Sequence, residues 1–272
     1  MNKAVILAAG LGTRMRAADA PVRLTAEQAR AADEGIKGKI PLNGRPFLDY
    51  VLSALADAGI REACLVVRPG PNSIREYYGK LSARRITIQF AIQEEQLGTA
   101  NALLAARPFV AGEPFLALNS DNYYPVEIYA ALRALGEPGL AAFERESLIE
   151  KGNIPRQRVR DFAILRIGAD GYLERIVEKP LELGDSAIQP NGGEMFVSMN
   201  CWRFDDSVFR ACEQVPRSVR GEFELPVAVQ FGIDALGMRF KSVPFHAGVF
   251  DLSRRSDIPD VERRLAGIKV SL

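Results

Sequence analysis

The sequence has few of the residues that form metal centres and nucleophilic triads. It contains a single histidine, His246, in 272 residues. A Ser–His–Asp triad or a multi-histidine metal site would have to pass through His246, and its surroundings, P-F-H-A-G, offer no such arrangement. We therefore expect His246 to have a structural role at a strand end.

Cysteine is also scarce. The chain has three cysteines, Cys64, Cys201 and Cys212, which are widely spaced and lie in apolar segments. An odd number in this setting argues against a disulfide framework. We interpret them as reduced core thiols of a cytoplasmic protein.

A strong charge excess and long apolar runs are absent too. The net charge of +1 gives no general attraction to nucleic acid or anionic lipid, so an anionic ligand must be bound by a local cluster. No stretch approaches the roughly 20 apolar residues of a membrane span, and the start lacks the apolar segment of a signal peptide. We expect a soluble protein with neither nucleic acid nor membrane as partner. The hydrophobic content of 47% is enough for a large core.

The hydrophobic pattern alternates between strands and helices. Alternation at this spacing predicts an α/β fold, a three-layer α/β/α sandwich with a mixed, mainly parallel central sheet. Ligands of such sheets bind beyond the carboxyl ends of the strands. The predicted strands cover residues 4–7, 63–67, 86–92 and 115–119, and the predicted helices cover 47–58 and 99–106.

The second half of the chain changes character. Two strand-like runs flank G-A-D-G at 168–171, which predicts a hairpin, and 194–204 is a further strand. Without internal repeats or a low-complexity linker, we expect one domain over 1–272. Thr25 to Gly35 carries a Thr-x-x-Gln capping box and a terminal glycine, so we expect a short inserted helix there, acting as a lid that orders when ligand binds.

The first strand runs into L-A-A-G-L-G-T-R-M, residues 7–15. Gly10 and Gly12 allow a sharp bend and close approach to a ligand, and backbone N–H groups, Thr13 and Arg14 suit phosphate oxygens. A dinucleotide fingerprint would need a third glycine where Met15 stands, and no Walker A sequence occurs. The loop therefore predicts another kind of phosphate site.

Five further motifs follow in order, and with the loop they cover nearly the whole chain. The set resembles the sugar-phosphate nucleotidylyltransferases, a family of nucleotide-sugar pyrophosphorylases with a glycosyltransferase-A-like, Rossmann-like nucleotidyltransferase fold. The motifs are K-G-K-I-P-L-N-G-R-P from Lys37, Q-E-E-Q-L-G-T-A from Gln93, L-A-L-N-S-D ending at Asp121, E-K-P from Glu178, and G-V-F-D-L around Asp251.

The resemblance implies a nucleotide-binding lobe over 1–125 and a sugar-phosphate-binding lobe over 126–272. Arg14 and Lys37 would contact the triphosphate, and Gln93, Gly98 and Thr99 the base. Q-E-E-Q-L-G-T-A is similar to the base-reading segment of uridylyltransferases, which implies UTP or dTTP. The nucleotide-binding set is Leu7, Ala8, Ala9, Gly10, Gly12, Thr13, Gln93, Gly98 and Thr99.

The implied reaction joins a nucleoside triphosphate to a sugar 1-phosphate, and it brings two anions together while pyrophosphate leaves. Cations are therefore needed on both sides, from Arg14 and Lys37 for the triphosphate and from Lys179 for the sugar phosphate. Mg²⁺ held by Asp121, with Asp251 as its partner, would bridge the phosphates. The nucleophile is already anionic, so no general base is required. The expected sugar-phosphate residues are Asn122, Glu178, Lys179 and Asn200, with core or turn roles as alternatives for Asn122, Tyr123 and Tyr124.

Departures from the family pattern leave alternatives open. Asn200 replaces a glycine of the sugar site, and Lys39 replaces an apolar residue beside Lys37. A guanylyltransferase for mannose 1-phosphate, a cytidylyltransferase, and a regulatory protein that senses a nucleotide sugar without turnover remain candidates. The set Arg14, Lys37, Asp121 and Asp251 favours an enzyme. The sequence leaves open whether the chain forms a homo-oligomer.

Overall fold

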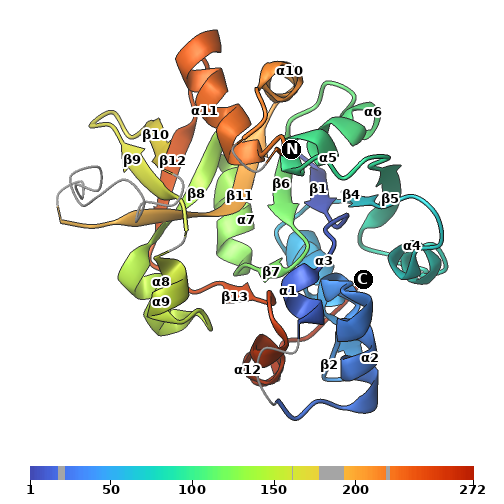
Figure 1. The fold of residues 1–272 in the computed structure, drawn as a ribbon. Coiled ribbons are helices and arrows are strands. Elements are labelled where there is room, and N and C mark those ends of the chain that lie inside the picture. The colour runs from blue at the N-terminus through green and yellow to red at the C-terminus, as the bar shows by residue number, and fades with distance from the viewer. Residues whose placement is uncertain (18–21, 161, 178–192, 219–220) are drawn as a thin grey trace.

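In a computed structural model the chain forms a nine-stranded mixed sheet (Figure 1). The structure describes residues 1–17, 22–160, 162–177, 193–218 and 221–272. The order β10-β9-β11-β6-β1-β4-β5 makes one path, and β8 joins β11 to β12. The strands are β1 (Lys3–Leu7), β4 (Glu62–Val67), β5 (Thr87–Ile92), β6 (Phe115–Asn119), β8 (Gly139–Glu144), β9 (Ile164–Ile167), β10 (Leu173–Val177), β11 (Phe196–Phe204) and β12 (Lys241–Phe245).

Helices cover both faces of the sheet, which confirms the predicted three-layer α/β fold. Alternate residues of β1 enter opposite cores, Ala4 and Ile6 one core and Val5 and Leu7 the other. The first core is covered by α3 (Phe47–Asp57), α4 (Ser73–Tyr78), α7 (Val126–Ala134), α8 (Arg145–Lys151) and α12 (Ile258–Leu265), the second by α5 (Thr99–Ala105), α6 (Arg107–Val110), α10 (Ser207–Gln214) and α11 (Leu225–Leu236).

The predicted strands and helices of the first half are confirmed within one or two residues at each end. The predicted hairpin is confirmed as well, because β9 and β10 pair antiparallel around a turn in which Gly171 has φ +78°. Strand β11 pairs antiparallel with β6, so one continuous sheet contains strands from both halves of the chain.

The inserted helix is confirmed as α2 (Ala26–Glu34). Its Thr25–Gln28 capping box is present, and Gly35 ends it in the left-handed conformation. Gln28 also donates to Pro41 O and to Glu262 in α12, each at 3.1 Å, so α2 is attached to the C-terminal helix beside it (Figure 1). Its closing over a ligand stays a prediction.

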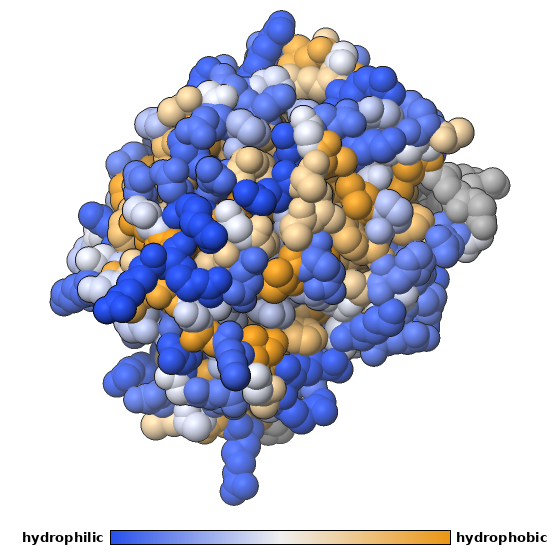
Figure 2. Space-filling view, turned by 180° about the vertical axis from the view of Figure 1, so that it is seen from behind, coloured by the Kyte–Doolittle hydropathy of each residue, from blue (hydrophilic) through white to orange (hydrophobic). Residues whose placement is uncertain are grey.

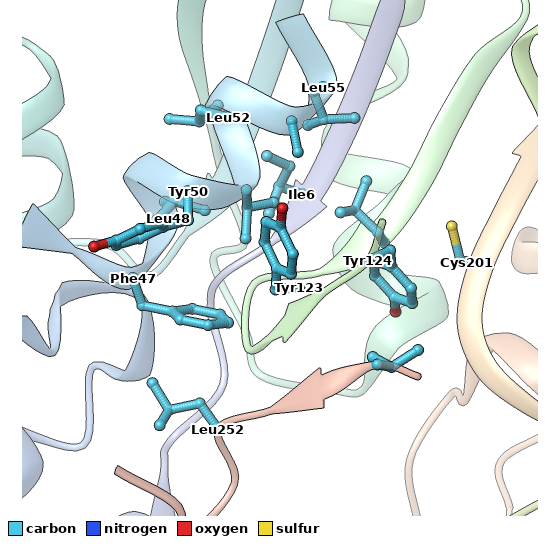
Figure 3. Close-up of a cluster of buried hydrophobic side chains, with 14 of the residues drawn as sticks. Ile6, Phe47, Leu48, Tyr50, Leu52, Leu55, Tyr123, Tyr124, Cys201 and Leu252 are labelled. Carbon is cyan, nitrogen blue, oxygen red and sulfur yellow. The ribbon is translucent and has the colours of Figure 1, made fainter. Parts of the chain in front are cut away.

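A small antiparallel ribbon crosses the end of the main sheet. It pairs β7 (Asn122–Tyr123) with β13 (Phe250–Asp251), and its core-facing side chains include Tyr123 and the fully buried Tyr124. Figure 3 shows Tyr123 near α3 and Tyr124 on the side of Cys201. Of the alternatives left open for these tyrosines, the structure therefore supports the core. The remaining elements are α1 (Thr13–Arg16), η1 (Lys37–Lys39), β2 (Pro41–Leu42), β3 (Arg45–Pro46), α9 (Arg156–Val159) and η4 (Arg255–Asp257).

The surface seen in Figure 2 is mainly hydrophilic and the cysteines are buried, as expected of a folded protein with an internal core. Seen from behind, hydrophilic side chains dominate, with smaller hydrophobic areas between them (Figure 2). All three cysteines are buried and free, as expected. Across the described ranges, no helix combines the length and apolar character needed to span a membrane.

Candidate functional site

The carboxyl ends of the parallel strands β1, β4 and β6 form the floor of a cavity. Leu7 is in register with Val66 on one side and Asn119 on the other, so the segments that follow these strands meet at the same edge. The cavity has a volume of about 420 Å³. It is lined by the whole predicted nucleotide set, Leu7, Ala8, Ala9, Gly10, Gly12, Thr13, Gln93, Gly98 and Thr99, and also by Lys37 and Asp121.

Lys37 and Asp121 form an ion pair in the cavity wall. Lys37 Nζ lies 2.7 Å from Asp121 Oδ2, and both side chains are about one fifth exposed, at 20% and 19%. Lys37 begins the single turn η1, which follows α2, and Asp121 follows β6 after Ser120. On the same turn, Lys39 Nζ lies 4.0 Å from the ring centroid of Tyr77. The two lysines therefore have different partners, Lys37 at the cavity and Lys39 on α4.

The β7–β13 ribbon brings Asp251 next to Asp121. Asp251 is paired with Asn122, and Leu252 N donates to Asp121 O at 2.8 Å. Asn122 Nδ2 also donates to Asp251 Oδ1 at 3.0 Å. Asn122 is thus a buried partner of Asp251, one of the roles that the sequence left open.

The buried position of Asp251 disfavours its charged form. Asp251 is 6% exposed, and burial, followed by the charge of Asp121, raises its pKa to about 6. The Arg158 guanidinium lowers this pKa but does not outweigh those effects. A cation bound between the two carboxylates would remove most of this cost.

These two carboxylates are candidate ligands of a divalent cation, with Asp121 in the cavity lining and Asp251 behind it, outside the lining. Within the described ranges, no group of three or more His, Cys, Asp or Glu side chains is placed to hold a metal. Mg²⁺ is often held by one or two carboxylates together with substrate phosphates and water, so a pair such as Asp121 and Asp251 is sufficient. The donor set is all oxygen, as a hard cation prefers.

Gly10 and Gly12 of the loop are glycines for different structural reasons. A Cβ on Gly12 would lie 2.0 Å from Gly35 O, and its φ is +64°, so Gly12 packs directly on the end of α2. A Cβ on Gly10 would have no atom within 4 Å. Close approach to a ligand, which we predicted for both, is therefore left as the explanation for Gly10, whereas Gly12 is required by the fold.

The predicted base-binding segment is held by the chain before α11. A Cβ on Gly98 would lie 2.5 Å from Phe223 O, and Phe223 N donates to Leu97 O at 2.7 Å. Thr99 Oγ1 accepts from Leu225 N at 2.8 Å. Gly98 is thus a glycine because another backbone contacts it, a constraint that the sequence pattern did not reveal.

Gln93 has its amide orientation fixed from within the protein. Its Nε2 donates to Gly98 O at 3.0 Å and to Asn101 Oδ1 at 2.8 Å. A carbonyl can only accept, so the nitrogen must face Gly98. No described residue donates to the amide oxygen, Oε1. This oxygen is therefore left to interact with a ligand.

The structure places the remaining predicted residues less directly. Arg14 lies on α1, with an exposed side chain that is not part of the cavity lining. On this single turn it is Met15 that points into the core, so Arg14 faces outward. Asn200 has φ +57° at an irregularity of β11, near Asn119, and also lies outside the lining. Glu178 and Lys179 lie outside the described residues. His246 follows β12, and its exposed side chain lies 3.2 Å from the exposed carboxylate of Glu194, so its structural role stays a prediction.

Some residues that line the cavity belong to none of the sequence motifs and were not predicted. Arg68 follows β4 at the same edge as the glycine loop, a position that the strand prediction alone could have identified. Asn72 caps α4, accepting from Ile74 N at 3.0 Å. Glu222 enters from the segment before α11, which only the tertiary structure brings here.

The fold and the cavity define an α/β protein whose pocket lies at the carboxyl ends of its parallel strands, the usual place for a ligand in such sheets. The chain belongs to the nucleotidyl transferase family, which matches residues 3–232. It is 26% identical over 264 residues to the UTP–glucose-1-phosphate uridylyltransferase AglF of Haloferax volcanii, covering 97% of this chain and 96% of that protein.

Two further comparisons extend this result. The bifunctional protein GlmU of Methanococcus vannielii is 27% identical over 84% of this chain, which spans about half of that longer relative, 46%. A crystal structure of UDP-glucose pyrophosphorylase complexed with UDP-glucose has a similar fold, with a TM-score of 0.73, 15% identity and coverage of 99% of this chain and 100% of that one.

The contrast between the two loop glycines can be tested by stability. Gly12→Ala forces a Cβ into Gly35 and a strained φ, so we expect it to lose at least about 2 kcal/mol of unfolding free energy. Gly10→Ala is the matched control and should stay within about 0.5 kcal/mol of the wild type. Urea denaturation measures both, and equal stabilities for the two variants would contradict the assignment.

The raised pKa of Asp251 predicts a pH-dependent stability difference. With a folded pKa of about 6 against an ordinary value of 3.8, the folded protein holds this proton longer than the unfolded chain. Its contribution to stability is therefore lost as pH rises from about 4 through 6. Asp251→Asn cannot ionise, so the unfolding free energy of the wild type relative to this variant should fall over that range. A difference independent of pH would refute the prediction.

Proposed function

We propose that this protein is a sugar-1-phosphate nucleotidylyltransferase, of EC class 2.7.7. A phosphate oxygen of the sugar 1-phosphate attacks the α-phosphorus of a nucleoside triphosphate, a new P–O bond forms, and pyrophosphate leaves. The carrying observation is the Lys37–Asp121 pair in the wall of a cavity built from the glycine loop and three strand ends. Family membership and the match to AglF over nearly its full length support the proposal.

The glycine loop and Lys37 have complementary roles in this reaction. Gly10 leaves open space for the triphosphate, which the loop N–H groups and the Thr13 hydroxyl would bind. Lys37, a compact point charge, would turn from Asp121 to the phosphates and stabilise the departing negative charge. Arg14 would reach the outer phosphates from its exposed position on α1. The nucleotide then lies in the lobe of residues 1–125.

Asp121 and Asp251 would hold Mg²⁺ on the side of the phosphates opposite the glycine loop. When bound, the ion neutralises charge on the α-phosphate as the second phosphate approaches. Asp121 supplies one carboxylate from the end of β6, and Asp251 supplies the other from β13. The residues assigned to the sugar phosphate are Glu178, Lys179 and Asn200, in the lobe of residues 126–272, with Asn122 supporting Asp251.

The orientation of Gln93 favours a base with an imino N–H. Its Oε1 accepts hydrogen bonds, and uracil, thymine and guanine each carry a ring N–H where cytosine and adenine have an acceptor. Cytosine and adenine can donate to Oε1 only from an exocyclic amino group, so the cytidylyltransferase alternative stays open to the assay. AglF acts on UTP by its name, and we therefore favour UTP, then dTTP, with a hexose 1-phosphate as the co-substrate. The guanylyltransferase alternative is distinguished by comparing GTP with UTP in the pyrophosphate-release assay.

A cytoplasmic location is part of the proposal. Three free, buried cysteines suit a reducing compartment, and nucleoside triphosphates are available there.

Asp121 separates the enzyme from a nucleotide-sugar sensor. Asp121→Asn should keep the fold but lower the rate of pyrophosphate release at least about 100-fold, a loss of roughly 2.7 kcal/mol of transition-state stabilisation. Asp251→Asn should act in the same direction. The assay is steady-state pyrophosphate release at saturating Mg²⁺ with UTP, dTTP, GTP and CTP against sugar 1-phosphates, beside thermal melting. Near-wild-type rates for Asp121→Asn would rule out the mechanism; tight nucleotide-sugar binding without turnover by the wild type would favour the sensor.

Base selection is tested at Gln93. Gln93→Ala removes a hydrogen bond in a desolvated site and should weaken UTP and dTTP binding by roughly 1 to 3 kcal/mol, measured by calorimetry. Gln89→Ala, an exposed position on β5, is the control and should bind both nucleotides as the wild type does. If wild type and Gln93→Ala have the same dissociation constants, the assignment is wrong.

A further inference from the structure

A largely buried arginine outside every motif contacts one of the two carboxylates proposed for Mg²⁺. Arg158, on the single turn α9, has an 11% exposed side chain. Its Nη2 lies 3.0 Å from Asp251 Oδ2, and its Nη1 donates to both oxygens of Asp257 at 2.9 and 3.1 Å. The side chain thus bridges two aspartates.

The contact with Asp251 is an ion pair rather than a well-aligned hydrogen bond. Nη2 is close to Oδ2, yet neither Nη2 nor Nε of Arg158 has a hydrogen-bond partner of good geometry within the described ranges. Its orientation is therefore set by Asp257, which takes both bonds of Nη1. The fixed guanidinium plane then presents its second nitrogen to Asp251.

Asp257 connects this arginine to the backbone beside Asp251. Asp257 Oδ2 accepts from Ser253 N at 3.0 Å and from Arg254 N at 2.8 Å, so it fixes the turn that follows β13. Ser253 Oγ in turn donates to Asp251 Oδ1 at 3.0 Å. Arg158, Asp257 and Ser253 form one connected network around the Asp251 carboxylate.

The partners of Asp251 leave room for one more ligand. A carboxylate has about four lone-pair sites. Asn122 and Ser253 occupy Oδ1, and Arg158 lies against Oδ2. By this count, one lone pair of Oδ2 has no partner among the described residues and is the one that a metal ion would use. A carboxylate held at both oxygens has little freedom to rotate, and such orientation by outer partners is what sets the affinity of many metal ligands.

We propose that Arg158 is a positioning residue that fixes Asp251 in the orientation that binds the divalent cation. This inference rests on the proposed function, because it requires Asp251 to be a metal ligand. Arg158 acts through Asp251 and need not touch the substrates. Two other roles are possible for a buried arginine here: one is purely structural, joining α9 to the turn at residues 253–257, and the other is a competitor of the cation for Asp251. Each predicts a different metal affinity for a variant.

The test is Mn²⁺ binding to the 272-residue chain in the absence of nucleotide, measured by electron paramagnetic resonance. Arg158→Gln should raise the Mn²⁺ dissociation constant about 10-fold, the lower end of the usual effect of losing an outer partner. The Mg²⁺ concentration for half-maximal pyrophosphate release should rise by a similar factor. Arg156→Gln is the matched control, since Arg156 lies on the same turn, is exposed and pairs with Glu146; it should bind Mn²⁺ as the wild type does.

A conservative variant keeps the test valid if Arg158→Gln does not fold. Arg158→Lys keeps the charge but cannot bridge two carboxylates with a planar fork, so its Mn²⁺ affinity should lie between those of the wild type and Arg158→Gln. Wild-type affinity in the folded Arg158→Gln or Arg158→Lys protein would overturn the proposal and leave only a structural role. Tighter binding in Arg158→Gln would overturn it in favour of competition.

Asp251→Asn separates this proposal from the proposed function. We expect it to lose at least as much Mn²⁺ affinity as Arg158→Gln. If Asp251→Asn binds Mn²⁺ like the wild type, Asp251 is not a ligand and the role of Arg158 fails with it. If Asp251→Asn weakens binding and Arg158→Gln does not, only the role of Arg158 is wrong. A wild type that binds Mn²⁺ as expected but releases no pyrophosphate would refute the enzyme and leave the positioning role intact.

Discussion

The site depends on holding two carboxylates close together where little water reaches them. Asp121 and Asp251 repel each other, and the more buried of the two, Asp251, has its pKa raised to about 6. Each has a cation at its side, Lys37 for Asp121 and Arg158 for Asp251. The arrangement is tolerable in the free protein because of these pairs. They do not fully compensate the burial, and the proposed divalent cation would supply the missing positive charge. Lys37 is accessible from the cavity, whereas Arg158 is locked by Asp257.

The surrounding fold brings these groups together from distant parts of the chain. Parallel pairing of β1 with β6 places the glycine loop and Asp121 at one edge. The β7–β13 ribbon then adds Asp251, and the tyrosines beneath it anchor the ribbon in the core (Figure 3). Tyr124, for example, donates its hydroxyl to Met199 O in β11, which connects the ribbon to the second half of the sheet. Rigid support of this kind is what the proposed metal ligand pair would require.

The sequence was informative wherever local patterns determine structure. The buried strands, the G-A-D-G hairpin and the Thr25–Gln28 capping box each depend on neighbouring residues, and each was predicted and is observed. Tertiary contacts were not predictable in this way. Gly12 and Gly98 were singled out for close approach to a ligand, but the backbones of Gly35 and Phe223 that require glycine there come from remote segments. Arg158 lies on one turn of helix without a motif, and only the folded chain shows its two aspartate partners.

The contact between Gly12 and Gly35 has a consequence for how the chain tolerates change. It joins the two ends of the inserted segment, and Arg16, which donates to Glu34 O at 2.9 Å, adds a second link. Together the two contacts close the stretch of chain between residues 12 and 35, which includes α2. Doubling the length of such a loop costs only about 0.6 kcal/mol of closure entropy. Because Gly35 lies two residues before Lys37, the contacts at the base of this loop hold Lys37 beside the glycine loop, and this separation depends little on the length of chain that the loop encloses.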